Sequence, residues 1–454
     1  MSLNVPLRMA SRMLRNVLYL FSGNLLSALL NLLMGYLILR YLSAEEYGRY
    51  GVVVDLLNML ALVFGSLFVN ALQRYVAMYR AARDYKKASG MLTVALTYAA
   101  VVSAMVFLPA FLFPETVARY LLRDMGYAPF VRLYSPAVPF IILSAYLSSF
   151  MKGMGMFARV GVFDLTLPTV VRAAVLVVGL PAFPGYGPQV ATLSSVSKFL
   201  SNFLLNSFAS FKATFGLLRH PEKEYELKEW LRYSVFVWGR YALSILSSNV
   251  KSVLVGSIKG AAQGGVFKVA FLVLSPVYML ETSLVNVLFT RLSKAMGKGE
   301  DVSGEVYRYS FYIVGAEILF GILLILVGPY VLRFFGKGYD AASPLLVLVL
   351  LAYVINAASS VHKVFLLSIG RSDLILLIHG INALVSLLGG FFLIRWLGTV
   401  GGVYAFVLEG TAGTLVAFLF YRLQTGRPPI DKKTAATLVL SVAAAVVYYT
   451  LTAG

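Results

Sequence analysis

The chain has 454 residues, of which 59% are hydrophobic and 13% charged; its mean hydropathy is +0.81, and it contains no cysteine. Soluble domains carry about 25% charged residues, so this composition excludes a cytosolic enzyme, a nucleic-acid-binding module and a disulfide-stabilised secreted domain. The formal net charge of +19 therefore indicates basic loops beside a membrane, not nucleic-acid binding.

Thirteen apolar segments are long enough to form membrane-spanning helices, which need about 20 residues each. In chain order the predicted spans are 16–42, 50–72, 88–113, 129–150, 160–182, 189–211, 232–256, 265–290, 307–332, 344–367, 374–396, 402–421 and 434–452. None alternates with the two-residue period of a barrel strand. The sequence therefore predicts an all-α polytopic membrane protein with about 13 transmembrane helices.

Lysine and arginine residues predict the orientation, because they concentrate in short cytoplasmic loops. With the N-terminus in the cytoplasm, the loops on that side contain 24 of the 39 basic residues, and the opposite loops contain nine. We therefore expect a multi-pass protein of the cell (plasma) membrane with a cytoplasmic N-terminus. Its immediate partners would be membrane lipids, and no nucleic acid.

A long polar loop divides the predicted helices into two sets of six. The loop covers 212–231 (KATFGLLRHPEKEYELKEWL) and is predicted to be cytoplasmic. The expected domains are an N-lobe over 1–211, this linker, a C-lobe over 232–424, and an appended C-terminal helix within 425–454.

The two sets of helices show a weak internal repeat at an offset of 216 residues. The offset aligns Gly23 with Gly239, Asn24 with Arg240, Asn31 with Ser247, and Gly48 with Gly264. Because each lobe has an even number of helices, both would run in the same direction, as in a parallel pseudo-repeat. Two facing lobes of this kind are the architecture of alternating-access transporters.

Three segments resemble known polysaccharide transporters. They are NVLYLFSGNLLSALLNLLMGYLILRYLSAEEYGRY (16–50), QRYVAMYRAARDYKKA (73–88) and KGAAQGGVFKVAF (259–271). They are similar to segments of the polysaccharide transporter family of the MOP exporter superfamily, which includes the Wzx-type O-antigen flippases. The resemblance implies a MATE-like fold and the transfer of lipid-linked oligosaccharides from the cytoplasmic to the outer leaflet.

Three predicted spans carry polar residues three or four positions apart, which places them on one helix face. Two of the three stripes contain cations: Ser195, Lys198, Asn202 and Asn206 form one, and Arg240, Ser244, Ser247 and Lys251 form another. Polar stripes can join helices to each other, but cations in register favour an aqueous cavity. The predicted polar lining of this cavity is Asn24, Asn31, Ser244, Ser247 and Asn202.

Charged residues within a span cost about 2.5–3.5 kcal/mol each at the membrane centre unless they are paired or hydrated. The spans contain eleven: Arg172, Lys198, Arg240, Lys251, Lys268, Lys363, Asp55, Asp164, Glu281, Glu317 and Glu409. We predict that five cations bind the phosphate of a polyprenyl-linked glycan, with arginine donating two parallel hydrogen bonds. They are Arg240, Lys198, Arg172, Lys251 and Lys268. The alternative for each is a structural ion pair.

Three acids within spans are candidates for coupling transport to an ion gradient, because a carboxylate can bind a proton or sodium in one conformation and release it in another. They are Asp55, Glu317 and Glu409. The alternative role is that of a counter-ion to the cations. We expect no cofactor and no metal site beyond this coupling ion, sodium or proton, and we expect a monomer.

The leading functional hypothesis is an alternating-access flippase for polyprenyl-phosphate-linked oligosaccharides, a transporter without catalytic residues. A MATE-type multidrug antiporter would share the fold, but its cavity should be acidic in order to hold cationic drugs. A membrane-embedded glycan polymerase or glycosyltransferase would need a long catalytic loop, and no predicted loop exceeds about 20 residues.

Overall fold

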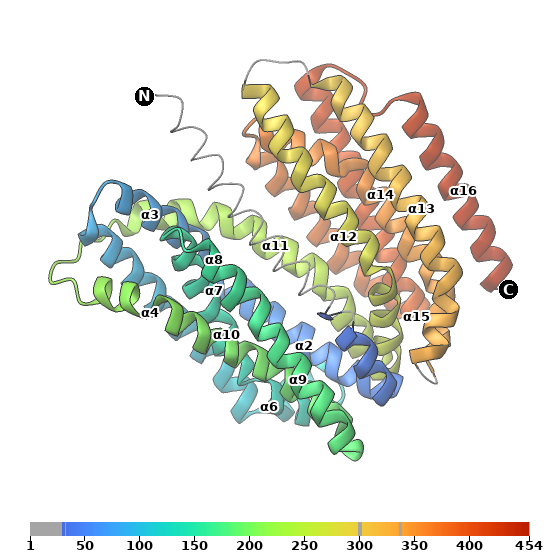
Figure 1. Cartoon of the computed structure of the whole chain (residues 1–454). Helices are drawn as coiled ribbons and strands as arrows, with labels where there is room; N and C mark the ends of the chain where they lie inside the picture. The colour runs from blue at the N-terminus through green and yellow to red at the C-terminus, as the bar shows by residue number, and fades with distance from the viewer. Residues whose placement is uncertain (1–29, 32, 298–301, 336–337, 454) are drawn as a thin grey trace. The chain divides into compact units, whose positions relative to one another are not determined.

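The computed structural model describes residues 30–31, 33–297, 302–335 and 338–453, and every regular element within these ranges is a helix (Figure 1). The predicted all-α class is therefore confirmed. Its physical basis is that a backbone in lipid must satisfy its hydrogen bonds within helices or within a closed barrel. Of the first predicted span, 16–42, most residues lie outside the described ranges, and so does the predicted cavity residue Asn24.

The described helices before the polar loop begin with residues 33–41. They continue as α2 Ala44–Gly65, α3 Val69–Ala81, α4 Tyr85–Leu112, α5 Pro114–Val117, the π-helix η1 Ala118–Leu122, the 3₁₀ turn η2 Met125–Tyr127, α6 Ala128–Tyr134, α7 Ala137–Gly153, α8 Phe157–Arg159, the π-helix η3 Val160–Thr166, α9 Leu167–Ala182, the 3₁₀ turn η4 Pro184–Tyr186 and α10 Gly187–Leu218.

The helices after the polar loop are longer. They are α11 Leu227–Lys259, α12 Ala261–Gly297, α13 Ser303–Phe335, the 3₁₀ turn η5 Asp340–Ala342, α14 Ser343–Ser368, α15 Ser372–Thr425 and α16 Lys432–Ala453. Side chains set some of the helix starts. Asp84 accepts a hydrogen bond from the backbone N–H of Lys87 at the start of α4, at 3.1 Å, and Asp431 accepts one from Thr434 at the start of α16.

Eight of the described helices are long and apolar enough to cross a membrane, or nine if the bent pair Met125–Tyr134 and Ala137–Gly153 forms one span. This supports a multi-pass membrane protein. Helix α10 coincides with the predicted span 189–211 but is not among the eight, since its polar stripe lowers its apolar content. The predicted count of 13 is not confirmed and stays a prediction.

Helix α15 covers two predicted spans, 374–396 and 402–421, and is broken at Gly398. The backbone there has φ 65° and ψ −139°, a conformation open almost only to glycine. The Lys259 ammonium donates a hydrogen bond of 3.0 Å to the carbonyl of Arg395, one of the last carbonyls before the break. The break therefore turns 54 residues of helix into two segments.

The chain divides into two compact units. The first comprises Met1–Leu42 and Leu56–Ala242, and the second comprises Ser43–Asp55 and Leu243–Gly454. The divisions fall inside α2 and α11, so each of these helices contributes to both units. The predicted lobes 1–211 and 232–424, the linker 212–231 and the appended segment 425–454 stay predictions.

In the first unit, an aromatic cluster holds the start of α11 against α3. Trp230 is fully buried, and its indole N–H donates to the Tyr79 hydroxyl at 2.9 Å. The Tyr79 hydroxyl in turn donates to Glu226 at 2.5 Å, and Lys87 on α4 donates to the other oxygen of that carboxylate at 2.6 Å. Helices α10 and α11 extend into the predicted polar loop, so that only 219–226 connects them. The contacts of Glu226 and Trp230 hold this connection, called the polar loop from here on, against α3 and α4.

In the second unit, α14 is the most buried helix and packs against α12, α13, α15 and α16. The first turns of α2 cross the first turns of α12 at two glycines. A Cβ atom on Gly48 would lie 1.7 Å from the carbonyl oxygen of Ala261, and one on Gly265 would lie 2.0 Å from that of Ala44. Both distances are far inside van der Waals contact, so this approach requires glycine on each helix.

Candidate functional site

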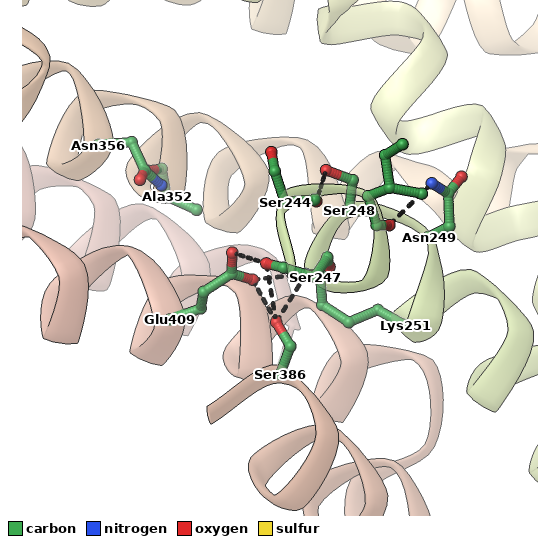
Figure 2. A network of polar contacts seen from close by, with 10 residues as sticks. Ser244, Ser247, Ser248, Asn249, Lys251, Ala352, Asn356, Ser386 and Glu409 are labelled. Atoms are coloured by element: carbon green, nitrogen blue, oxygen red, sulfur yellow. Dashed lines mark hydrogen bonds and ion pairs between the residues drawn. The ribbon is translucent and has the colours of Figure 1, made fainter. Parts of the chain in front are cut away.

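A buried lysine and glutamate form the centre of a polar network between α11 and α15 (Figure 2). Lys251 Nζ lies 2.5 Å from Glu409 Oε2 and 3.1 Å from Ser386 Oγ, and it also donates to the carbonyl of Ser247. The hydroxyls of Ser386 and Ser247 donate to the two oxygens of Glu409. Lys251 is 2% exposed and Glu409 is 8% exposed. The cost of removing both charges from water is thus compensated by their ion pair and by the hydrogen bonds that the ammonium and carboxylate groups form with the serines.

The helix geometry explains how these groups meet. Ser247 and Lys251 lie one turn apart on one face of α11, as the predicted stripe requires. Ser386 and Glu409 lie on opposite sides of the Gly398 break in α15. Two of the four residues of the predicted stripe, Ser247 and Lys251, are therefore in the network. The break in α15 brings Ser386 and Glu409 together.

A second ion pair joins α2 and α12. Lys268 Nζ lies 2.6 Å from Asp55 Oδ2 and 3.0 Å from the carbonyl oxygen of Gly51. Both side chains are about one-fifth exposed, more than those of Lys251 and Glu409. This pair is therefore partly open to solvent.

Both lysines line one cavity of about 330 Å³ in the second unit. Its other polar lining comes from Asp55, Ser248 and Ser252. Its aromatic lining comes from Phe267, Phe271, Tyr278, Tyr353 and Phe406. Lys251 Nζ lies 5.2 Å from the centroid of the Phe406 ring, in the range of a cation–π contact. The cavity therefore combines two ammonium groups with a wall of aromatic rings.

A separate polar cluster lies in the first unit, around Asp164 in the π-helix η3. The Asp164 carboxylate accepts hydrogen bonds from Ser148 at 2.7 Å and from Asn206 at 3.0 Å. Asn206 also donates to Asn202 at 2.5 Å. Such π-helical turns are frequent at functional sites. The predicted residue Asn202 thus belongs to an acid–amide cluster.

Two of the predicted cations lie near this cluster. The half-buried Lys198 interacts electrostatically with Arg172 and with Asp164. Arg172 Nη1 donates to Asn31 Oδ1 at 3.4 Å, which places the predicted cavity residue Asn31 beside it. The first unit therefore brings Arg172, Lys198, Asn202 and Asn31 into one polar region.

Arg240 is half-buried on α11 and, within the described ranges, has no hydrogen-bond or ion-pair partner. It belongs to the first unit, whereas Ser244, Ser247 and Lys251 on the same helix belong to the second. Eleven residues separate Arg240 from Lys251, or about 16 Å along the helix. The five predicted phosphate-binding cations are thus distributed between the two units.

Glu317 on α13 differs from the other two coupling candidates. It is fully buried, and neither of its carboxylate oxygens has a hydrogen-bond partner among the described residues. Asp55 and Glu409 are each held by a lysine. Across the same ranges, no group of three or more His, Asp or Glu side chains is arranged to hold a metal ion.

The prediction from sequence omitted Ser386 and the aromatic wall. Two signals were present. Asn382 and Ser386 are one turn apart within the span 374–396, and Phe271 and Tyr278 are two turns apart within 265–290. Neither pattern includes a charge, so neither stands out from ordinary helix packing.

Comparison with protein families finds a match over residues 13–296, more than half of the chain, to the model described as "Polysaccharide biosynthesis protein". No curated protein sequence matches the chain. The described fold is similar to those of solved membrane transporters.

An inward-facing multidrug resistance MATE family transporter of the MOP superfamily has a TM-score of 0.71 and 15% identity, covering 88% of this chain and 94% of its own. The lipid II flippase MurJ in an inward closed conformation also has a TM-score of 0.71 and is 16% identical; the match covers 96% of this chain and 93% of the MurJ chain. A MOP superfamily transporter from Pyrococcus furiosus has a TM-score of 0.62 and 16% identity, and the match covers 90% of this chain and 95% of that one. The reverse polarity of the binding pocket of that protein suggests that its function is different. The chain therefore has a MATE- and MurJ-like fold.

Proposed function

The chain belongs to the polysaccharide biosynthesis protein family, and from this premise we propose that it is an alternating-access flippase for polyprenyl-phosphate-linked oligosaccharides. The glycan would pass from the cytoplasmic to the outer leaflet of the cell membrane, while the polyprenyl tail remains in the bilayer. The single observation that carries this proposal is the cavity lined by Lys251 and Lys268. Two ammonium groups in a partly apolar cavity suit a phosphate or pyrophosphate.

The ion pairs suggest how phosphate binding and ion coupling would be linked. Each cavity lysine is held by a carboxylate, Lys251 by Glu409 and Lys268 by Asp55. A phosphate that bound to the lysines would compete with these carboxylates. A displaced carboxylate would then need another cation, a proton or sodium, because a bare charge at membrane depth is costly. Asp55 and Glu409 therefore stay proposed coupling residues, as does Glu317.

The remaining cations are proposed to guide the phosphate outside this cavity. Arg240 suits that role because, within the described ranges, no acid neutralises it. Lys198 and Arg172 share the polar region of the first unit with Asn31 and Asn202. These residues would contact the phosphate and the first sugars through charge-assisted and neutral hydrogen bonds.

Two alternatives receive less support. A MATE-type drug antiporter would share this fold, so the fold does not separate the two functions. However, Asp55, the acid in the described lining of the cavity, is already paired with Lys268 and is not available to hold a cationic drug. A glycan polymerase or glycosyltransferase would need room for a catalytic loop. Among the described connections between helices the longest is 219–226, and it is held to α3 and α4.

Reconstituted proteoliposomes test the proposal directly. We expect the protein to move a fluorescent polyprenyl-pyrophosphate oligosaccharide across the bilayer and to leave ethidium, a cationic dye, where it is. Arg240→Ala should slow the movement of the glycolipid at least about tenfold, which corresponds to a loss of about 1.4 kcal/mol in the binding of its phosphate during transport. Lys228→Ala, an exposed change on the same helix, is the matched control. Movement of ethidium instead of the glycolipid would contradict the proposal.

A further inference from the structure

Glu317 and its neighbours form a chain of charges that reaches the cavity. On α12, Glu281 is 8% exposed and interacts electrostatically with Glu317 and with Lys363 on α14. Lys363 also interacts with Glu409, and Glu409 forms the ion pair with Lys251. The order is therefore Glu317, Glu281, Lys363, Glu409 and Lys251, all within the second unit.

Counting the charges in this chain shows an imbalance. Three carboxylates face two ammonium groups, so these five side chains, if all were ionised, would carry one net negative charge in the protein interior. The carboxylate without support is Glu317, because both its oxygens lack a hydrogen-bond partner in the described part of the protein. An unpaired buried carboxylate is far less stable than its neutral form. One proton on Glu317 balances the chain.

Among the side chains that the structure describes, no other charged group near Glu317 removes the imbalance. Helix α16 also packs against α13, and its only charged residues, Lys432 and Lys433, are its first two. The turn η5 contacts α13 as well and brings Asp340, a further acid. On α14, His362 lies beside Lys363 and donates to the carbonyl of Pro429. From the same helix, the uncharged Tyr353 lies within electrostatic range of Glu317.

Two tyrosines separate the acids from the cavity. Tyr278 and Tyr353 stack with ring centroids 6.2 Å apart, and both line the cavity that contains Lys251 and Lys268. Tyr353 interacts electrostatically with Glu281 and Glu317, and Tyr278 with Glu281. Both acids therefore lie within electrostatic range of the aromatic wall, and a charge entering the cavity acts on them through low-dielectric material.

We propose that Glu317, together with Glu281 and Lys363, is a proton-binding site behind the Tyr278–Tyr353 wall, occupied by one proton in this conformation. This inference rests on the proposed transport function for its role and assigns the proton, not sodium, as the coupling ion at Glu317. A hard cation needs several oxygen ligands, and within the described ranges no group of three or more Asp, Glu or His side chains is arranged to hold a metal ion. A phosphate arriving at Lys251 would add negative charge to the same chain and strengthen the hold on the proton.

Infrared spectroscopy of the purified protein in detergent tests the site without any substrate. At neutral pH we expect the carbonyl stretch of a protonated carboxyl group, shifted to lower frequency in D₂O. Glu317→Gln should remove this band, and the exposed control Glu115→Gln should keep it.

Thermal unfolding gives a second measurement. If Glu317 is neutral in the folded protein and ionised in the unfolded protein, folding takes up one proton. The unfolding temperature of the parent should therefore fall as the pH rises from about 6 to 9. Glu317→Gln should flatten this dependence, and Glu115→Gln should leave it unchanged.

Three results would overturn the site: no protonated carboxyl band in the parent, a band that persists in Glu317→Gln, or a band that sodium chloride abolishes. These readings are independent of transport. A protein that shows the band but moves no lipid-linked glycan would contradict the proposed function and leave the proton site standing. A protein that transports but lacks the band would contradict the proton site alone.

Discussion

Lys251 and Glu409 are 158 positions apart in the chain, yet their charged atoms lie 2.5 Å apart with both side chains almost fully buried. The pair links the cavity to the interior of the second unit, since Lys251 lines the cavity and Glu409 lies within electrostatic range of Lys363. A ligand that binds Lys251 must therefore compete with the same ion pair that stabilises the folded protein.

Removing one partner of this pair should destabilise the protein strongly. Glu409→Gln leaves the Lys251 ammonium buried without its carboxylate, and the expected loss is about 3–5 kcal/mol of unfolding free energy. The double variant Lys251→Met with Glu409→Gln should recover most of that loss. Unfolding in detergent, analysed as a double-mutant cycle, measures the coupling. Equal stability of the single variant and the parent would show that the pair contributes nothing.

The glycine crossing between α2 and α12 should not tolerate a methyl group. Gly48→Ala places its Cβ against the carbonyl of Ala261, and the backbone must shift at a cost of about 1–3 kcal/mol. Gly216→Ala on α10 is the matched control, because nothing lies within 4 Å of its Cβ position. That change should be neutral or stabilise the helix by up to about 1 kcal/mol. A comparison of unfolding temperatures decides, and similar values for both variants would argue against the close approach.

The break in α15 should depend on glycine at position 398. Gly398→Ala must hold an alanine at positive φ, which costs about 1–3 kcal/mol. Gly389→Ala in the helical part of α15 is the control, since its nearest neighbour would be in ordinary contact at 3.9 Å. Calorimetry should find a lower unfolding temperature for Gly398→Ala only. If both variants unfold like the parent, the segment has no such break.

Acid should detach the polar loop from the first unit. The hydrogen bonds from Lys87 and then Tyr79 hold the pKa of Glu226 below its ordinary value. Because the pKa is lower in the folded state, this stabilisation is present above the unfolded value of about 4.3 and is lost as pH falls through the folded value. Trp230 fluorescence, read in a background with Trp238→Phe and Trp396→Phe, should report the release below about pH 4.

Glu226→Gln supplies the control for the acid release. A glutamine cannot form the charged contact with Lys87, so the fluorescence should already be shifted at neutral pH and should change little on acidification. An acid transition of unchanged size in Glu226→Gln would mean that another group controls the loop.

Part of the candidate site was predictable because helix faces are a local property. The four-residue spacing of Ser247 and Lys251 by itself places both on one side of their helix, and the two residues do lie in one network. The pairing of Lys251 with Glu409, and that of Lys268 with Asp55, was not predictable. A charge within a span indicates only that it needs a partner, and every acid in the other spans satisfies that need equally well.

The sequence by itself determined the class of protein and the positions of most of its helices, because hydropathy and length decide which segments a membrane accepts. The tertiary structure alone decided which of the three candidate coupling acids form an ion pair with a lysine and which one does not. Glu317 and Glu409 look alike in the sequence, each a single acid in an apolar run. Packing gives Glu409 an ammonium group and two hydroxyls, and gives Glu317 no bonding partner among the described residues. In a medium that cannot solvate charge, that difference determines where a proton must reside.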